Sequence, residues 1–316
     1  MKSKILLPAM TVFLSLAFVL LNPAPTAAQE RGRFRVTLTG FVVNHETSDN
    51  ILQSDGTGDE VFALVNFAEI WSSNRIFGAL QNRQTLIYGD TSSHATIFSG
   101  TLEHRGYRVQ AGSASRTGGF RTGDPYPPPA GYGGTTPPGA PANVQARLLP
   151  IILWEGELRR GGSQANAAVI IPTIWESDYS SDMLNNVWTR QVNDYLRHFA
   201  ANGARLITVP APGAVRTPLV VQRDTVLSFI PQRNDFDRPI GMDGDTFNPL
   251  AADPQPATFI PAVMVLTFTS AQEAAASTLN SHTGSRGVVE ISYRDGRNYG
   301  EGSYTISLLV ERLPDR

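Results

Sequence analysis

The segment that decides the fold class is Phe34-Arg-Val-Thr-Leu-Thr-Gly-Phe-Val-Val-Asn44. Its apolar side chains Phe34, Val36 and Leu38 alternate with polar ones until Gly40 interrupts the pattern. Such alternation is typical of a strand with one buried and one solvated face, and an interior glycine marks a bulge or bend. The segment therefore predicts a half-buried β-strand that bulges or bends at Gly40.

Further along the chain, apolar segments of strand length predict more sheet. Three of them are almost continuously apolar, which favours buried strands: 61–67, 148–155 and 169–176. The last two each contain a proline, Pro150 or Pro172, and a proline within a strand predicts an edge, an end or a bulge. Near the C-terminus, 288–293 and 303–310 predict a hairpin with a long loop.

Two segments predict helices. Residues 181–202 carry an apolar stripe at helical spacing, with Gly203 placed to end the helix. Residues 270–279 open with Ser270 and Glu273, which have the spacing of a capping box. We therefore expect a mainly β protein with antiparallel β-sandwich-like sheets, one long amphipathic helix over 181–202 and one short helix over 270–279.

Residues 1–28 have the pattern of a secretory signal peptide. Lys2 and Lys4 precede an apolar run from 5 to 21, and small residues then lead to a cleavage site after Ala28. The alternative is a retained membrane anchor, against which Pro8 and the small-residue exit weigh. We expect a secreted or periplasmic protein with no membrane span after cleavage.

Composition divides the remaining chain into three parts. Residues 29–111 form an N-terminal β-rich part, and 144–316 form a C-terminal β-rich part with the helices, unless the two make one domain. Between them, 112–143 are rich in Pro and Gly and predict a flexible loop or linker. The alternative for this stretch is a proline-rich ligand for a partner's groove, which the interrupting glycines disfavour.

Charge and cysteine content exclude several classes of protein. The only two lysines lie in the signal peptide, so cleavage leaves 24 of the 26 basic residues, all arginine, against 28 acids, a formal net charge of −4. The arginines are scattered singly and form no basic stripe, so we expect no nucleic-acid partner. The absence of cysteine excludes disulfides, thiol catalysis and zinc fingers.

No catalytic or cofactor-binding residue is predicted. Without lysine, the mature chain lacks the Walker phosphate loop, Schiff-base catalysis and the Ser-x-x-Lys acylating motif. It also lacks a Gly-x-Ser-x-Gly nucleophile elbow, and His45-Glu46 has no second histidine one helical turn away to complete a zinc motif. These gaps favour a protein that is not an enzyme.

Acidic loops predict a bound calcium ion. Asp55, Asp59 and Glu60 surround two glycines immediately before the strand at 61–67, and Asp243 lies in a second acidic loop. Carboxylates and backbone carbonyls are the ligands that calcium prefers, and a sandwich gathers its loops at two ends. The sequence therefore predicts a calcium site formed by Asp55, Asp59, Glu60 and Asp243. The alternative is that these acids occupy separate solvated turns.

Two stretches near the N-terminus also carry a resemblance. Gly40-Phe-Val-Val-Asn-His-Glu-Thr-Ser-Asp49 is followed by Leu52-Gln-Ser-Asp-Gly-Thr-Gly-Asp-Glu-Val-Phe62. This pattern, GFxVNxET…DGxGDEVF, resembles the opening of a group of bacterial exported proteins, and the segments 237–242 and 304–313 are similar to that group as well. No activity is known for the group, so the resemblance implies export and nothing about catalysis.

Two functions compete on these observations. The first is an exported, non-enzymatic module that binds or assembles with a protein or glycan, with calcium holding its loops. The second is a polysaccharide hydrolase that uses a carboxylate pair among Glu155, Glu157 and Glu176 beside Trp154 and Trp175, which would stack on sugar rings. Absent catalytic signatures favour the first.

Overall fold

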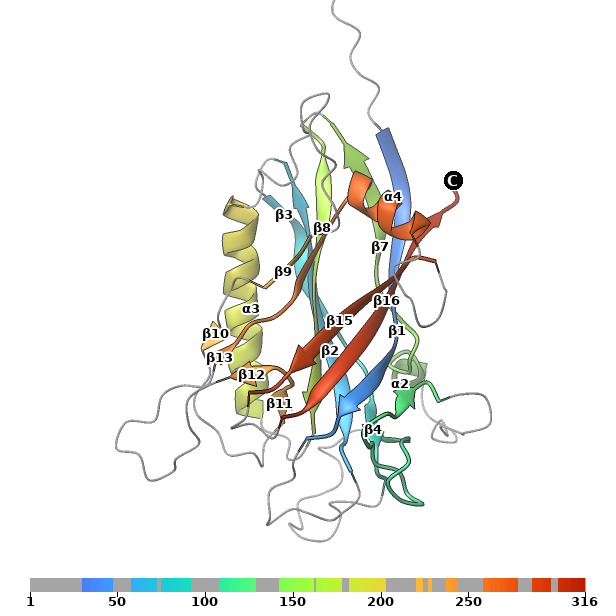
Figure 1. The fold of residues 1–316 in the computed structure, drawn as a ribbon. Coiled ribbons are helices and arrows are strands. Elements are labelled where there is room, and N and C mark those ends of the chain that lie inside the picture. The colour runs from blue at the N-terminus through green and yellow to red at the C-terminus, as the bar shows by residue number, and fades with distance from the viewer. Residues whose placement is uncertain are drawn as a thin grey trace, which may run out of the picture.

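Two mainly antiparallel sheets pack face to face, as Figure 1 shows, so the expected fold class is confirmed. The computed structural model describes residues 30–47, 58–72, 75–91, 108–128, 142–161, 163–177, 182–202, 220–223, 227–228, 237–243, 258–277, 286–296 and 301–315. The predicted signal peptide, 1–28, lies outside them. No helix within these ranges is both long and apolar enough to cross a membrane.

The first sheet is built around the alternating N-terminal segment. Its strands are β1 (Glu30–His45), β6 (Pro125–Tyr126), β7 (Ile151–Arg160), β15 (Val288–Arg294) and β16 (Ser303–Leu313). β1 pairs with β16 along its length, and β7 and β6 share the opposite edge of β1. The predicted hairpin of β15 and β16 is confirmed by its register, in which Ile291 faces Ile306.

The bulge predicted in β1 is confirmed, because its register with β16 shifts between Leu38 and Gly40. At Gly40 a β-carbon would lie 2.1 Å from the backbone oxygen of Tyr126. Only glycine permits β6 to lie so close beside β1. The glycine thus both interrupts the alternation and admits the neighbouring strand.

The second sheet has β8 at its centre. It contains β2 (Val61–Trp71), β3 (Arg75–Gln84), β4 (Ile87–Gly89), β5 (Arg108–Gln110), β8 (Asn166–Glu176), β9 (Val220–Gln222), β11 (Arg238–Pro239) and β14 (Val263–Thr267). β2 pairs with the whole of β8 on one side, and β14 and β11 share the other side. Every residue of β8 is buried, as its continuous apolar run predicts.

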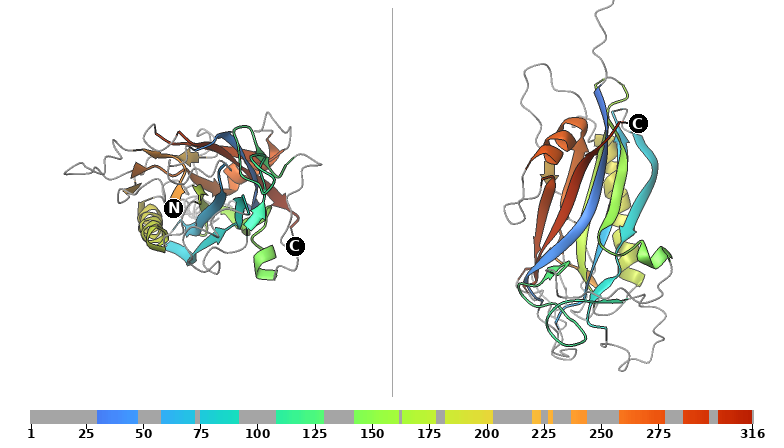
Figure 2. Two further views of the ribbon diagram at one scale, coloured as in Figure 1. Left: turned by 90° about the horizontal axis from the view of Figure 1, so that it is seen from below. Right: turned by 90° about the vertical axis from the view of Figure 1, so that its right-hand side faces the viewer.

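The helices and the remaining strands cover this framework. They are α2 (Ala142–Gln145), α3 (Asp182–Asn202), α4 (Phe268–Ala276), β10 (Leu227–Ser228), β12 (Met242–Asp243) and β13 (Thr258–Phe259). α3 lies on the outer face of the second sheet in Figure 1, where Trp188 packs edge-on against Trp175 of β8. α4 lies at the opposite side of the molecule from α3, and its Phe268 meets Phe34 of β1 (Figures 1 and 2).

The short helix begins earlier than its predicted cap. The sequence places its start at Ser270, but the N-cap is Thr267, whose side chain accepts a hydrogen bond from the backbone nitrogen of Ser270. The Ser270 hydroxyl completes the box by accepting from the backbone nitrogen of Thr267. Ser270, at the third helical position, therefore makes the reciprocal hydrogen bond that the sequence analysis assigned to Glu273.

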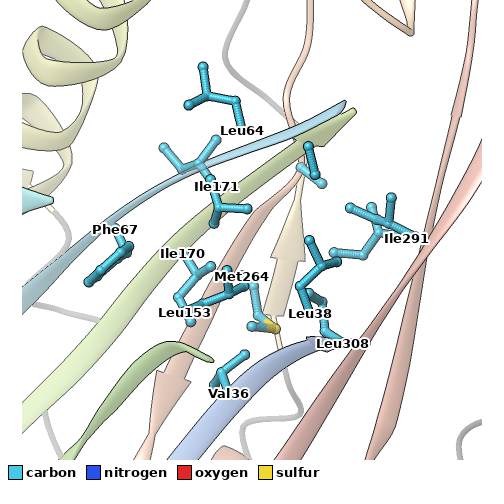
Figure 3. Close-up of a cluster of buried hydrophobic side chains, with 14 of the residues drawn as sticks. Val36, Leu38, Leu64, Phe67, Leu153, Ile170, Ile171, Met264, Ile291 and Leu308 are labelled. Carbon is cyan, nitrogen blue, oxygen red and sulfur yellow. The ribbon is translucent and has the colours of Figure 1, made fainter. Parts of the chain in front are cut away.

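Apolar side chains from both sheets form the core. Those drawn and labelled in Figure 3 are Val36, Leu38, Leu64, Phe67, Leu153, Ile170, Ile171, Met264, Ile291 and Leu308. They come from strands on both sides of the Pro/Gly-rich stretch, and the buried apolar residues make one cluster. Residues 29–111 and 144–316 therefore share a single core.

Part of the Pro/Gly-rich stretch packs against that core. The described residues 112–128 include Phe120, which is fully buried, and Tyr126, which stacks on Phe41 of β1. The backbone nitrogen of Phe120 donates to the carbonyl of Asp59, and that of Asp59 donates back to Phe120. Two aromatic anchors thus hold turns whose composition alone predicts a loop; residues 129–141 of the stretch lie outside the described residues.

Pro172 differs from the expectation for a proline in a strand. Pro150 directly precedes β7, as expected, but Pro172 lies within the central strand β8. On the side of β8 away from β2, the partner strand changes. β14 pairs with β8 as far along as Ile170, and β11 pairs with it from Trp175 onward. Pro172 lies between them, where no strand requires its missing N–H. Its carbonyl accepts from the Tyr293 hydroxyl of β15 instead.

Replacing Tyr293 with Phe tests this arrangement. The change removes the donor to the Pro172 carbonyl and the acceptor for the Ala262 backbone nitrogen, both buried. Unpaired buried polar groups cost about 1–3 kcal/mol each, so the urea midpoint should fall with little change in the slope of the transition. A variant with an unchanged midpoint would show that the hydroxyl does not support β8.

Candidate functional site

Strand ends from both sheets converge at the lower end of the sandwich in Figure 1. Antiparallel strands bring the last residues of some strands beside the first residues of others, and here those residues are polar. We call the following set the strand-end network: Thr47 after β1, Asp59 before β2, Glu176 at the end of β8, Arg238 in β11, Asp295 after β15, and Tyr304 in β16. All six are buried, which is unusual for charged side chains.

Arg238 joins the two sheets through two ion pairs. Its Nη2 lies 2.8 Å from Oε2 of Glu176 in the second sheet, and its Nη1 lies 2.8 Å from Oδ2 of Asp295 in the first. The other carboxylate oxygen of Asp295 accepts from the backbone nitrogens of Gly241 and Met242, at 2.6 and 3.1 Å. Burial raises the pKa of Asp295, while Arg238 and these donors oppose the rise.

Thr47 joins the carboxyl group of Asp59 to that of Glu176. Its backbone nitrogen donates to Oδ2 of Asp59 at 2.8 Å, and its hydroxyl lies 2.8 Å from Oδ1 of Asp59. The same hydroxyl makes a short contact with Oε1 of Glu176. Tyr304 donates its hydroxyl to Oδ2 of Asp59, also in a short contact. The ends of β1, β2, β8 and β16 are therefore linked through side chains.

Burial dominates the ionisation of this region. It raises the pKa of Asp59 well above its usual value, and the neighbouring Glu176 carboxyl raises it further against the opposing hydrogen bonds from Tyr304 and Thr47. Burial and the nearby Asp59 carboxyl also raise the pKa of Tyr304 well above its ordinary value. The phenol of Tyr304 thus stays protonated and remains a hydrogen-bond donor.

The network packs tightly enough to require a glycine. A β-carbon on Gly302 would lie 2.4 Å from Cγ2 of Thr47 and 2.9 Å from Oδ2 of Asp295. The carbonyl of Gly302 accepts from the backbone nitrogen of Asp295 at 2.8 Å, which closes the hairpin at this point. The turn residue between β15 and β16 therefore fits against two members of the network.

Glu60 turns away from Asp59, as successive residues in extended backbone do. Its Oε1 lies 3.7 Å from Nη1 of Arg108, and that nitrogen also donates to the carbonyl of Asp90 at 3.0 Å. Both side chains of the Glu60–Arg108 pair are largely buried. This pair fixes the start of β2 to β5 and is separate from the strand-end network.

The structure places the four predicted calcium ligands as follows. Asp59 is in the strand-end network, Glu60 faces Arg108, and Asp243 is exposed on β12. Asp55 lies outside the described residues. Within the described ranges, no three His, Asp or Glu side chains gather in a way that could hold a metal ion. The structure identifies no metal ligand among those residues, and the four-residue calcium site stays a prediction.

The residues suggested for a hydrolase are occupied in other ways. Trp154 and Trp175 are buried in the core, at 6% and 0% exposed. Glu155 pairs with Arg33 and Arg35 at 2.7 and 2.9 Å, and Glu157 pairs with Arg159 at 2.6 Å. Glu176 belongs to the strand-end network.

Compared with protein-family models, with curated proteins and with solved structures, the chain has no significant match.

Sequence reasoning singled out Asp59 for the calcium site and Glu176 for the hydrolase pair, but it did not single out Thr47, Arg238 and Tyr304. Arg238 could have been recognised from the sequence, because it is the one basic residue beside the apolar Pro239, Ile240 and Met242. Threonine and tyrosine next to strand ends carry no such signal, because such residues are common on any strand. Only the pairing of distant strands brings the six together.

Removing the Arg238 cation should be costly. An Arg238→Met variant leaves Glu176 and Asp295 buried without their counter-charge, a loss of roughly 3–5 kcal/mol. The matched control is Arg197→Met, which removes an exposed pair with Asp194 on α3 and should cost less than about 1 kcal/mol. Chemical denaturation compares the two, and equal losses would contradict the structural role of Arg238.

Proposed function

We propose that this chain is an exported, non-catalytic β-sandwich module that binds a protein or glycan partner at the end where the strand-end network lies. The sandwich would act as a rigid support, and the segments that connect its strands at that end would make the contact. Binding residues carried on connecting segments above a rigid sheet framework are a common arrangement in β-sandwiches.

The observation that carries the proposal is where those segments join the framework. Five connecting segments begin or end within two residues of a residue that takes part in the network through its side chain or its backbone nitrogen. These segments are 48–57, 178–181, 229–236, 244–257 and 297–300. The network bonds fix the points from which these segments start. Fixed anchor points reduce the entropy that a binding surface loses when it meets its partner.

The chemistry of the network supports a structural role for its acids. Their oxygens accept hydrogen bonds from Thr47, Tyr304 and two backbone nitrogens, and Arg238 neutralises two of the carboxylates. A general acid or base must reach the proton that it transfers, whereas these acids are 4% exposed or less. Their arrangement favours holding the strand ends over reacting with a substrate.

The rival hydrolase has weaker support. Sugar rings stack on exposed aromatic faces, whereas Trp154 and Trp175 contribute theirs to the core. Glu155 and Glu157 lie on the outer edge region of the first sheet, each already paired with arginine. We therefore propose the binding module in preference to the enzyme.

An assay for released reducing ends separates these two functions. Incubated with a panel of purified polysaccharides, the wild type should release no more reducing ends than a variant with Glu155→Gln and Glu157→Gln. Hydrolysis by the wild type that is lost in this double variant would contradict the proposal and favour the carboxylate-pair enzyme.

Segment replacement tests the location of binding. In one variant, residues 48–57 are replaced by an equally long Gly-Ser segment, which leaves Thr47 and Asp59 in place. In the matched control, residues 162–164, which join β7 to β8 at the opposite end, are replaced in the same way. Purified polysaccharides and isolated cell-envelope fragments serve as probes. Binding should fall at least tenfold in the first variant alone, and equal binding by both would contradict the proposal.

A further inference from the structure

If all the acids of the strand-end network were ionised, the network would have one hydrogen too few for its hydrogen bonds. The Thr47 hydroxyl has a single proton, yet its oxygen lies within hydrogen-bond distance of two carboxyl oxygens, Oδ1 of Asp59 and Oε1 of Glu176. If both carboxyls were anions, one of these two contacts would join lone pairs between buried side chains. One carboxyl must therefore carry a proton of its own.

The other bonds of the network locate that proton. Oδ2 of Asp59 already receives two donors, the Thr47 backbone nitrogen and the Tyr304 hydroxyl, which leaves Oδ1 as the oxygen that can hold a hydrogen. Oε2 of Glu176 pairs with Arg238, which favours the anionic form of Glu176. The hydrogen bonds therefore have one consistent direction. Asp59 donates from Oδ1 to the hydroxyl oxygen of Thr47, and the Thr47 hydroxyl donates to Oε1 of Glu176.

The charges that surround the pair agree with this direction. Arg238 is the cation within the network, and it already pairs with the two carboxylates of Glu176 and Asp295. Arg108 faces Glu60 on the other side of the backbone, and Asp237, next to Arg238 in the chain, adds a further buried acid. Among the described residues no ion pair is made to Asp59, so a third anion there would add negative charge beside Glu176 without a counter-charge from them.

We propose that Asp59 and Glu176 share one buried proton through Thr47, and that this proton acts as a pH-dependent latch on the end of the sandwich. With the proton present, the ends of β1, β2 and β8 are joined by a complete chain of hydrogen bonds. Its loss leaves the Thr47 hydroxyl able to satisfy only one carboxylate, so these ends separate more easily. This latch concerns proton binding and stability, and it can fail or hold independently of the proposed partner binding.

The direction of the pH effect follows from linkage. Burial and the Glu176 carboxyl raise the pKa of Asp59 in the folded protein, so the folded state binds the proton more tightly than the unfolded state does. The stabilisation is complete below the unfolded aspartate value, about 4, and is lost as pH rises through the raised folded value. Unfolding within this window releases the proton.

The Asp59→Asn variant tests the latch, because its amide copies the protonated carboxyl. The amide nitrogen can donate to Thr47, and the amide oxygen can accept from Tyr304 and the Thr47 backbone. Across the window, the folding equilibrium constant of the wild type should fall about tenfold per pH unit relative to the variant, the slope of one proton. At the alkaline end the variant should be at least as stable as the wild type.

Two controls keep the result specific. Asp194→Asn, on the exposed face of α3, should follow the wild-type curve. Asp295→Asn, which removes the anion that Arg238 and two backbone nitrogens require, should be less stable at every pH. Because Asp295 remains in the Asp59→Asn variant, the difference between wild type and that variant isolates the shared proton.

The measurements are made in chelator and repeated with millimolar calcium. The latch predicts the same curves in both conditions, whereas the calcium site predicted from the sequence would make them differ. Parallel curves for the wild type and Asp59→Asn, or a variant that is destabilised equally at all pH values, would overturn the proposal. A wild type that calcium stabilises while Asp59→Asn does not respond would also overturn it, because Asp59 would then be a cation ligand.

Discussion

The ion pairs of Arg238 join the two sheets at one end, beside the hydrogen bonds that Thr47 and Tyr304 make to acids of the second sheet. The guanidinium reaches Glu176 at the end of the central strand β8 and Asp295 after β15, and so spans the gap between the sheets at one end. Burying three charges carries a large desolvation cost, and removing one partner leaves that cost without its compensation. Arg238 therefore fixes the ends of β8 and β15 relative to β11, since displacement of either end breaks one of its ion pairs.

The rest of the structure is consistent with this constraint. Towards the other side of the molecule, apolar contacts such as Phe34 against Phe268 close the core. The Asn166 side chain binds the edge of β7, accepting from the Arg159 backbone nitrogen at 2.7 Å and donating to the Glu157 carbonyl at 2.8 Å. The Asn166 amide thereby takes the place of a neighbouring strand along part of that edge. A chain without cysteine thus fixes its strand ends and edges through side-chain hydrogen bonds.

Local patterns in the sequence predicted most of the framework. Alternation predicted β1 and the final hairpin, and continuous apolar runs predicted β2, β7 and β8, because burial on one or both faces leaves a direct trace in the sequence. β3 was missed, since Arg75–Gln84 has no clear alternation and owes its structure to pairing with β2. Pro172 was misplaced because the change of partner from β14 to β11 is a property of distant strands. The site was predictable only as scattered acids, because the bonds of Thr47, Arg238 and Tyr304 join residues up to 245 positions apart.

Native-state hydrogen exchange tests the central claim most directly, because three backbone amides donate to carboxylates of the network instead of to another strand. They belong to Thr47, which bonds to Asp59, and to Gly241 and Met242, which bond to Asp295. If the network holds this end of the sandwich, these amides exchange as slowly as those in the centre of β8 and β2. Exchange at the rate of an exposed turn would show that the carboxylates do not hold these strand ends, and would contradict the account.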